Sequence, residues 1–392
     1  MTDHITQDVP VRRVTDGPAS HFFGYYEKTP WDATGRFLLA LEVDCEGRPN
    51  TGDDVARVCL IDLDVDNQRQ VIGETRAWCW QQGCMLRWLP SHPKDRIIHN
   101  ARDGARPMSV VADVRTGDTY RLPLPVYAVS PDGRWAVTTN FARINRTRPG
   151  YGYRGVPDPG EGDLCPDDDG VTWMDLRSGE HRMIATFAGI AALAPNPAAD
   201  GAEHWVNHLQ INPDGSRVAL LHRWRTPGTS GLNSRLVTMG PDGSEPRLLA
   251  HSSAFSHYDW LDTDRIFAWS RHPDAEADSF VLIADGSGEA DVVAPRLLTK
   301  NGHCSFSPDR RWLLTDTYPD ADRQQTLILY RWPGGPRVDI GRFYLPPELK
   351  GEFRCDLHPR WDRDGTQVCI DSAHEGTRQV YVLDVSEIVS GW

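Results

Sequence analysis

The sequence lacks the features that divide a long chain into separate domains. Its 392 residues contain no linker rich in serine and glycine, no change from strand to helical periodicity, and no single-sign charge run beyond Asp167–Asp169. No stretch reaches the roughly 18 consecutive apolar residues that a membrane-spanning helix requires. We therefore expect one domain over residues 1–392 that does not enter a membrane.

Targeting and disulfide signals are also missing. The first ten residues contain neither a basic segment nor an apolar core of the kind found in secretory signals. The eight cysteines are scattered without the spacing of a disulfide framework, which is typical of free thiols in a reducing compartment. The sequence therefore predicts a cytoplasmic protein.

The chain has fewer basic than acidic residues. Lysine and arginine together number 42 against 55 aspartates and glutamates, so the net charge is −13. This balance repels polyphosphate at long range and argues against a nucleic-acid partner. A small anionic ligand is still compatible with the composition, because a local group of arginines can reverse the sign inside a pocket.

The sequence does contain a repeated turn signal. A Pro-Asp-Gly turn, or a degenerate form of it, precedes an apolar run with aromatic or β-branched residues. Proline fixes φ, aspartate bonds the backbone two residues on, and glycine adopts positive φ, so each copy predicts a hairpin. The seven copies begin at Trp31, His92, Ser130, Asn212, Asp262, Ser307 and Asp362.

A further strand signal follows each turn. These signals cover residues 58–62, 109–113, 171–175, 236–239, 280–284, 327–330 and 380–384. A sheet of four short strands cannot bury both of its faces alone, so the units must stack on their neighbours, and a closed ring removes the exposed edges. The sequence therefore predicts an all-β protein, a seven-bladed β-propeller with four-stranded antiparallel blades.

One interval between turns is much longer than the others. It contains the aromatic segment 148–153 and the acidic residues 167–169, and it predicts a loop insertion at about 144–170. This insertion is either a functional loop or a poorly ordered excursion. Its two tyrosines and several arginines favour an ordered loop.

Polar side chains recur at the strand ends next to the turn signals. In a propeller the innermost strands line a central channel, and ligands bind where residues of several blades meet at its mouth. A single histidine at a strand end is commonly only a structural hydrogen-bonding group, but recurrence in every unit favours a site. The residues expected at the mouth are His21, Tyr25, Gln81, Gln82, His99, Asn100, Tyr127, Asn140, Arg143, His204, His208, Arg223, His257, His303, Tyr318, Arg354, His358 and His374.

Histidine, tyrosine and arginine together suit β-elimination from a uronic acid. That reaction needs a base for the C5 proton, an acid for the departing glycosidic oxygen, and a cation beside the carboxylate. His99 and Tyr127 are the candidates for the first two roles, and Arg143 or Arg223 for the third. Glycoside hydrolysis would instead require two positioned carboxylates, and none stands out in this set.

A second group has the composition of a metal site. Cys355 and His358 have a spacing used in zinc sites, and His303 and Asp316 come from the preceding unit. Four such ligands would form a closed, structural Zn²⁺ site. The alternative is a buried thiol with histidines bonded to backbone carbonyls. No motif for an organic cofactor is present.

Several segments together resemble a known family. They are residues 21–26, 80–84, 140–143, 148–153, 303–309 and 355–361. In this order they resemble the seven-bladed polysaccharide lyases, above all the ulvan lyases and rhamnose-glucuronate lyases, and more distantly oligogalacturonate lyase. The resemblance implies a metal-independent elimination at glucuronate or iduronate, possible rhamnose linkage, and a zinc site that supports the fold.

The resemblance also assigns residues. Tyr127 and Arg143 flank the hairpin at Ser130 as the family tyrosine and arginine do, and His99 matches a histidine of the preceding blade. Gln82 stands where those lyases have a second histidine, and Arg223 matches a further substrate-contacting arginine. The expected substrate-binding residues are Gln82, Asn100, Asn140, His208 and Arg223, the metal ligands are those named above, and the expected partner is a uronic-acid-containing oligosaccharide.

Two other functions fit the same pattern. A non-enzymatic propeller that binds sugars or proteins would need no convergent pocket. A related glycosidase would keep the channel and change the catalytic set. A peptidase propeller is disfavoured, because no Gly-x-Ser-x-Gly elbow or α/β domain follows.

Overall fold

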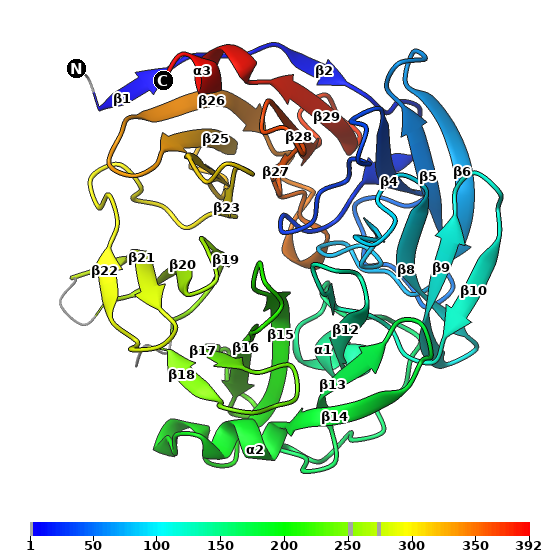
Figure 1. The fold of residues 1–392 in the computed structure, drawn as a ribbon, viewed down its shortest axis with the longest axis vertical. Coiled ribbons are helices and arrows are strands. Elements are labelled where there is room, and N and C mark those ends of the chain that lie inside the picture. The colour runs from blue at the N-terminus through cyan, green and yellow to red at the C-terminus, as the bar shows by residue number, and fades with distance from the viewer. Residues whose placement is uncertain (1–2, 250–253, 273–275) are drawn as a thin grey trace.

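The computed structural model describes residues 3–249, 254–272 and 276–392. Seven sheets stand around a central axis, with the strands of each sheet ordered from the axis outward (Figure 1). The predicted seven-bladed β-propeller with four-stranded antiparallel blades is confirmed. Among the described residues no helix is both long and apolar enough to cross a membrane.

The first four blades follow the chain without interruption. Blade 1 contains β3 (Ser20–Phe22), β4 (Phe37–Val43), β5 (Ala56–Asp62) and β6 (Gln68–Thr75). Blade 2 contains β7 (Arg87–Trp88), β8 (Arg96–Asp103), β9 (Arg106–Asp113) and β10 (Thr119–Leu122). Blade 3 contains β11 (Ala128–Val129), β12 (Trp135–Thr139), β13 (Gly170–Asp175) and β14 (His181–Thr186). Blade 4 contains β15 (Glu203–Ile211), β16 (Val218–Arg225), β17 (Asn233–Met239) and β18 (Arg247–Leu249).

The N-terminal segment completes the last two blades. Blade 5 contains β19 (Tyr258–Trp260), β20 (Arg265–Arg271), β21 (Asp278–Ala284) and β22 (Ala290–Val292). Blade 6 contains β23 (Ser305–Phe306), β24 (Trp312–Asp316), β25 (Gln324–Arg331) and β26 (Arg337–Tyr344), with β1 (His4–Thr6) added parallel to β26. Blade 7 contains β27 (Arg360–Trp361), β28 (Gln367–Ser372) and β29 (Gln379–Asp384), with β2 (Val11–Arg13) as its antiparallel outer strand. The ring is therefore closed by strands from both ends of the chain.

The repeated turns lie where the sequence predicts hairpins. Each copy joins the first strand of a blade to the second, and each later strand signal lies in the third strand. In blade 3, Ser130 Oγ donates to Asp132 Oδ1 at 2.6 Å, and Asp132 accepts from the Arg134 N–H at 3.0 Å. Gly133 has φ of 69°, and a β-carbon there would lie 2.5 Å from Ser91 N, so this turn requires glycine.

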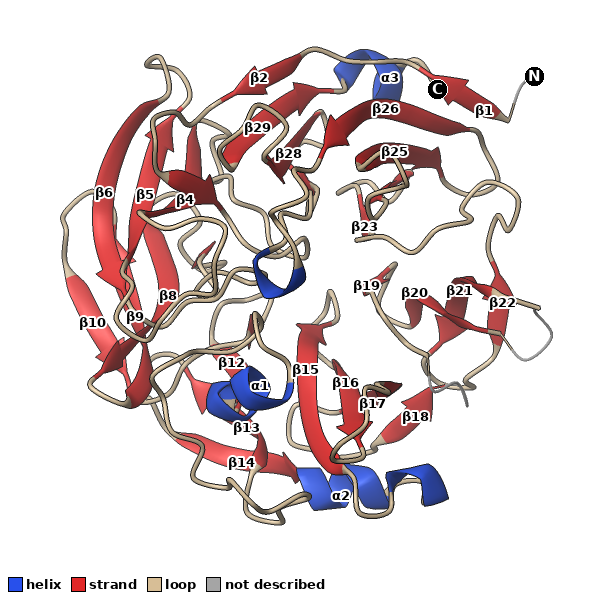
Figure 2. Cartoon of the chain, turned by 180° about the vertical axis from the view of Figure 1, so that it is seen from behind, coloured by secondary structure: helices blue, strands red, loops and turns tan. Residues whose placement is uncertain are grey.

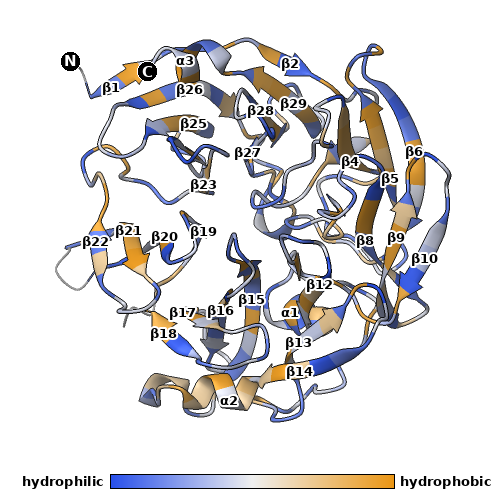
Figure 3. Cartoon of the chain, in the orientation of Figure 1, coloured by the Kyte–Doolittle hydropathy of each residue, from blue (hydrophilic) through white to orange (hydrophobic). Residues whose placement is uncertain are grey.

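The core lies between the blades rather than around the axis. Side chains alternate along each strand, so in β4 Leu38 contacts the apolar cluster shared with blade 7, while Leu39 belongs to the cluster shared with blade 2. Six such clusters cover the seven interfaces between blades. Hydrophobic residues accordingly concentrate on the strands, and the loops are mainly hydrophilic (Figure 3).

Short helices occupy the periphery and one face. β12 and β13 are joined by residues 140–169, which include α1 (Phe141–Thr147), and α1 lies over blade 3 (Figure 2). At the rim, α2 (Phe187–Ala192) follows β14, and a 3₁₀ helix (Pro197–Ala199) precedes β15. A second 3₁₀ helix (Gly351–Phe353) and α3 (Ser386–Ser390) belong to the last blade units.

Candidate functional site

The innermost strands give the channel two chemically different mouths. Each of them is followed by one of the repeated turns, so the turns gather at one end of the channel, which we name the turn mouth. Residues that precede the innermost strands gather at the other end, which we name the histidine mouth. Four histidines of four successive blades meet there, namely His208, His257, His303 and His358.

These four residues form one continuous group, the histidine cluster. The ring centroid of His303 is 4.2 Å from that of His257 and 4.4 Å from that of His358. The His208 ring lies 6.2 Å from that of His257. All four side chains are buried. Histidines 46 and 55 positions apart along the chain are therefore placed in contact by the arrangement of successive blades around one axis.

Two tyrosines line this cluster. The ring centroid of Tyr25 is 4.9 Å from that of His208 and 4.8 Å from that of His358. The Tyr25 hydroxyl is 3.4 Å from Nε2 of His208, and the Tyr318 hydroxyl is 3.5 Å from Nε2 of His257. Burial raises the pKa values of both tyrosines well above the usual value, so both hydroxyls keep their protons at neutral pH.

A buried ion pair holds the segment that places Tyr25 in the channel. Arg360 contacts both carboxylate oxygens of Asp371, at 3.1 and 2.6 Å, and also donates to the carbonyls of Gly24 and Tyr25. Gly24 has φ of 134°, and a β-carbon there would lie 2.9 Å from the carbonyl oxygen of Gln82. Only glycine therefore allows this segment to approach blade 2 so closely.

Burial keeps His208, His257 and His358 of this cluster uncharged. It lowers the pKa values of His208, His257 and His358 well below the usual value, and neighbouring positive groups lower them further. Nδ1 of His257 lies 3.0 Å from Oδ1 of Asn301 and donates to it, which leaves Nε2 as the nitrogen with the free lone pair. That lone pair is available to accept a proton.

Part of the cluster has the donor set of a divalent metal site. The ligand atoms of His303, Asp356 and His358 all lie within 4.8 Å of one another, and the three side chains are buried. Nε2 of His303 and Nε2 of His358 are buried without a hydrogen-bond partner among the described residues. Two imidazole nitrogens and one carboxylate suit Mn²⁺, Fe²⁺ or Zn²⁺, so these residues fit a resident cation.

Neighbouring groups orient these ligands. Nδ1 of His303 lies 2.9 Å from each oxygen of Asp316 and donates to that carboxylate, so Nε2 is directed toward the other ligands. Arg354 binds Asp356 through two nitrogens, at 2.5 and 2.6 Å. Both contacts are of the kind that fixes a metal ligand from behind.

Comparisons with known proteins find similarity in structure. Neither the protein-family models nor the curated proteins include a match to this chain. An oligogalacturonate lyase in complex with manganese has 17% identity, covers 98% of this chain and 96% of its own, and gives a TM-score of 0.71. This likeness and the two that follow show the fold alone. An oligogalacturonate lyase from Vibrio parahaemolyticus is 14% identical over 98% of this chain and 96% of its own, with a TM-score of 0.67. The β-propeller domain of the Trilobed protease from Pyrococcus furiosus is 12% identical over 93% of this chain and 96% of its own, with a TM-score of 0.54.

The metal group differs from the four residues expected from the sequence. His303 and His358 belong to it, but Asp356 supplies the third ligand and Asp316 lies behind His303. Cys355 faces an apolar cluster instead, and burial raises the pKa of its thiol to about 12. Asp356 is two residues from His358, so the alternation of side chains along an extended segment is the signal that could have identified it.

The three residues expected to be catalytic are not brought together. His99 lies on the face of β8 toward blade 1, where a β-carbon on Gly73 would be 3.6 Å from its Nε2. Tyr127 belongs to the apolar cluster on the opposite face of blade 2. Arg143 is fully buried in α1 and bonds other partners. No hydrogen bond, ion pair or ring contact joins any two of them within the described ranges.

Arg143 is a structural residue of the 140–169 segment. Its Nε donates to the His204 carbonyl at 2.6 Å, and its Nη2 donates to the carbonyls of Asp163 and Leu164, both at 2.9 Å. Its Nη1 lies 3.9 Å from a carboxylate oxygen of Asp158. The guanidinium therefore ties the loop to blade 4, which the sequence does not reveal.

Of the five residues expected to bind substrate, two form structural hydrogen bonds and three lie in the channel. Asn100 is used entirely in joining blades 2 and 3, through Val126 and Tyr153. Asn140 caps α1 and bonds two aspartates of the insertion. Gln82, His208 and Arg223 lie in the channel with Tyr127. The Tyr127 hydroxyl donates to Gln82 Oε1 at 2.9 Å and accepts from the His208 N–H at 2.7 Å.

Arginines surround the histidine mouth. Arg148 lies over the ring of Tyr151, 4.5 Å from its centroid, and Arg354 lies 4.8 Å from the ring centroid of Tyr318. Burial, together with the positive charge of Arg148, lowers the pKa of Arg223 to about 9. Two guanidinium groups that repel each other at a channel mouth favour an anion between them. Arg148 and Tyr151 come from the long loop and were not expected at the mouth from the sequence.

Replacement of Arg143 by alanine is expected to destabilise the loop rather than abolish the chemistry. Three carbonyls would lose their donor, each at a cost of about 1–3 kcal/mol. We expect a lower Tm and faster proteolysis between residues 158 and 164. Arg134→Ala is the matched control, since its side chain is 82% exposed. Unchanged Tm together with lost kcat would instead assign Arg143 to the reaction.

Proposed function

We propose that the protein is a carbon–oxygen lyase that cleaves uronic-acid oligosaccharides by β-elimination at the histidine mouth. The observation that carries this proposal is the convergence of the metal-ligand group His303, Asp356 and His358 with a neutral imidazole, His257, and with arginines. Two structural neighbours are oligogalacturonate lyases, and one of them is described in complex with manganese, which supports the same reaction class.

The reaction breaks one C–O bond and one C–H bond of the uronate. A base takes the proton from C5, and the electron pair of that bond forms a double bond between C4 and C5. The bond between C4 and the glycosidic oxygen breaks, and that oxygen leaves with a proton from an acid. Negative charge grows on the C6 carboxylate before the oxygen leaves, so positive groups beside the carboxylate lower the barrier.

His257 is the proposed proton acceptor. Its Nδ1 is fixed by Asn301, so Nε2 is the nitrogen that can take the proton. Its ring stands 4.2 Å from that of His303, which places it next to the metal-ligand group. This geometry brings the base to the α-carbon of a carboxylate held at that group.

Protonated tyrosines are the proposed proton donors. The hydroxyls of Tyr25 and Tyr318 lie on the two sides of the cluster, beside His208 and His257 respectively. Since their pKa values are raised, each hydroxyl holds a proton until a developing alkoxide nearby accepts it.

Positive charge for the carboxylate has two sources. Arg148 and Arg223 approach the channel without an ion pair between either of them and an acidic group among the described residues. A divalent cation held by His303, Asp356 and His358 would supply further charge against the enolate-like carboxylate. The sequence led us to expect a structural Zn²⁺ site. The cation proposed here lies instead at the reactive end of the channel.

The test is an elimination assay with defined substrates. Oligogalacturonate, ulvan and rhamnose-glucuronate oligosaccharides are each incubated with the protein and Mn²⁺, and the ultraviolet absorbance of the unsaturated product is followed. Absorbance with one of them identifies both reaction and sugar, including the glucuronate or iduronate specificity proposed from the sequence. Tight binding of uronates without new absorbance would favour a sugar-binding propeller, and reducing ends without absorbance would favour a glycosidase.

A further inference from the structure

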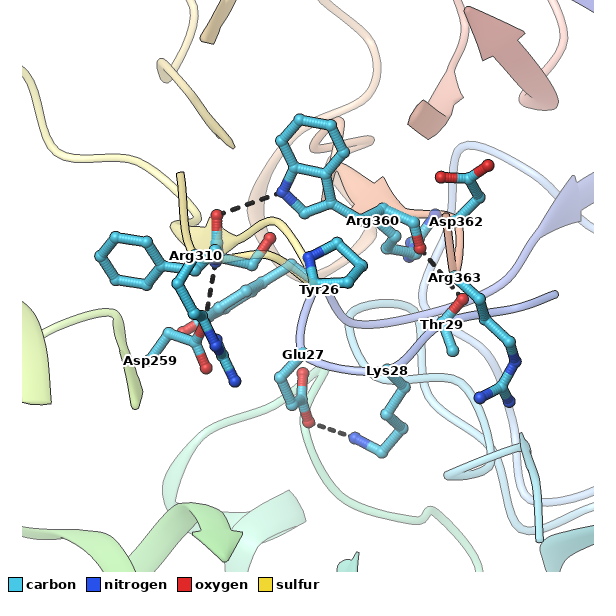
Figure 4. A pocket seen from close by; sticks show the side chains of 13 residues that line it. Tyr26, Glu27, Lys28, Thr29, Asp259, Arg310, Arg360, Asp362 and Arg363 are labelled. Carbon is cyan, nitrogen blue, oxygen red and sulfur yellow. Dashed lines mark hydrogen bonds and ion pairs between the residues drawn. The ribbon is translucent and has the colours of Figure 1, made fainter. Parts of the chain in front are cut away.

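The turn mouth contains a second pocket that the proposed reaction does not use. Two adjoining cavities, of about 350 and 240 Å³, open there and are lined by residues of all seven blades. Both are lined by Glu27, Lys28, Asp259 and Arg310, so they form one site with two lobes. Figure 4 shows the larger lobe. Together they have room for a small molecule of several carbon and oxygen atoms.

A wall of side chains separates this pocket from the histidine cluster. The ring of Tyr26 contacts His257 and His303, with centroids 5.9 and 5.5 Å apart, while another part of the residue lines the pocket. Its hydroxyl is fixed by the backbone of Tyr258, at 2.9 and 3.1 Å. The connection between β3 and β4 thus places Tyr25 at the histidine mouth, and Glu27 with Lys28 at the turn mouth.

The pocket holds an excess of unpaired positive charge. Arg310 donates one hydrogen bond, to the Trp260 carbonyl, and Arg363 bonds only the carbonyls of Trp31 and Asp32. Neither has an ion pair among the residues that the structure describes. Nε of Arg87, in the second lobe, is buried without a hydrogen-bond partner there. The chain as a whole has a net charge of −13, so a local group of cations without acidic partners stands out from its surroundings. Such a group attracts an anionic ligand.

Three carboxylates line the pocket and limit how much negative charge that ligand can carry. Asp362 accepts from the N–H and hydroxyl of Thr366, whereas Glu27 and Asp259 have oxygens in reserve. Glu27 pairs with Lys28 through one oxygen, and its other oxygen, Oε2, is buried without a partner within the described ranges. One oxygen of Asp259 accepts the Phe306 N–H at 3.0 Å, so the carboxylate keeps further acceptor capacity. Unused carboxylate oxygens repel a polyanion and accept hydrogen bonds from hydroxyl groups.

Aromatic side chains complete the pocket. Trp361 and Phe306 line the larger lobe and are 6% and 5% exposed. Flat rings of this kind cover the apolar face of a pyranose, while charged and polar groups meet its substituents. Cations, hydroxyl acceptors and an aromatic wall therefore converge on one small volume.

We propose that the pocket at the turn mouth binds a monomeric sugar acid, a polyhydroxylated molecule with one carboxylate. The carboxylate is bound by Arg310 and Arg363, and the hydroxyls donate to Glu27 and Asp259. A neutral sugar leaves the arginines unpaired, and phosphate offers too few hydroxyls for the two carboxylates. This inference does not depend on the reaction proposed for the histidine cluster.

Calorimetric titration with D-glucuronate and D-galacturonate tests the proposal. The titrations use His358→Ala protein, in which the opposite mouth is impaired, and D-glucose and inorganic phosphate serve as comparison ligands. We expect at least one uronate to bind and both comparison ligands to bind about tenfold more weakly or not at all, as the loss of a charge-assisted bond predicts.

Substitutions locate the binding. Arg310→Gln and Arg363→Gln should each weaken uronate binding by about tenfold or more. Arg363 is exposed, so its replacement leaves the fold intact even if the Arg310 variant is unstable. Arg311→Gln is the matched control, because it removes the same charge from the neighbouring, exposed residue, whose side chain bonds only the Trp392 carbonyl.

Four results would overturn the proposal. The first is the absence of uronate binding to the wild-type protein. The second is binding that survives both Arg310→Gln and Arg363→Gln, and the third is phosphate binding as tight as uronate binding. Binding that His358→Ala abolishes, but Arg310→Gln does not affect, would also contradict it and would place the uronate at the histidine mouth.

Discussion

Replacement of His257 by alanine is expected to lower kcat for uronate elimination on the order of 10²–10⁴-fold, which is the contribution of a positioned general base. The imidazole is buried, and Asn301 holds its Nδ1, so Nε2 is the nitrogen of His257 that can accept the proton. The measurement is the rate of formation of the unsaturated product at saturating substrate and Mn²⁺. Since His257 is not one of the three grouped ligands, Mn²⁺ affinity should stay close to that of the wild type.

His99→Ala is the informative control for this variant. His99 is also a buried histidine beside the channel strands, but it faces blade 1 and bonds only the Asn100 carbonyl, at 3.1 Å. We expect it to keep most of the wild-type kcat. A large loss in His99→Ala together with an active His257→Ala would restore the assignment made from the sequence and contradict the one made from the geometry.

Replacement of His358 by alanine is expected to remove both cation binding and activity. Among the residues with described positions, His303 and His358 each present a buried Nε2 without a hydrogen-bond partner, so each replacement removes one of the three grouped ligands. Mn²⁺ titration followed by electron paramagnetic resonance measures the binding directly. Even removal of an outer group such as Asp316 costs about 10–100-fold in metal affinity, so loss of a direct ligand should exceed that range.

Cys355→Ser distinguishes the metal ligands expected from the sequence, which include Cys355, from those grouped in the structure, which do not. The Cys355 side chain lies in an apolar cluster with Leu345, Leu349 and Ala373, apart from the grouped ligands. We expect Mn²⁺ affinity in this variant to match the wild type, and Asp356→Asn to weaken it. Chelation followed by Mn²⁺ addition should remove and restore activity. Full activity after chelation, or equal effects of Cys355→Ser and His358→Ala, would contradict the proposed centre.

The fold was predictable because its determinants are local. A turn such as Ser130–Gly133 depends on contacts within five residues, and the alternation in β4 divides its side chains between two neighbouring blades whatever lies elsewhere. Seven repeats of these local rules leave few architectures other than a ring. The sequence therefore predicted the number of blades and located the second and third strands of each.

The site was predictable only in its outline. Positions at strand ends next to the turn signals led to His208, His257, His303 and His358 as residues of the mouth, although His208 lies within β15, at its bulge. The direction of His99 could not be obtained in this way, because it depends on which face of β8 meets blade 1. The role of Arg143 depends on a loop that folds back over blade 4, and loop conformation has no periodic signal.

The pairing of β2 with β29 couples the closure of the ring to the proposed cation site. His303 belongs to blade 6 and His358 to blade 7, and blade 7 becomes a full sheet only when the earliest strand of the chain pairs with the last one, β29. The sheet that presents His358 to the proposed cation site is therefore completed by a strand from the opposite part of the chain. Loss of the pairing between β2 and β29 is expected to weaken the proposed cation site together with the blade that carries it.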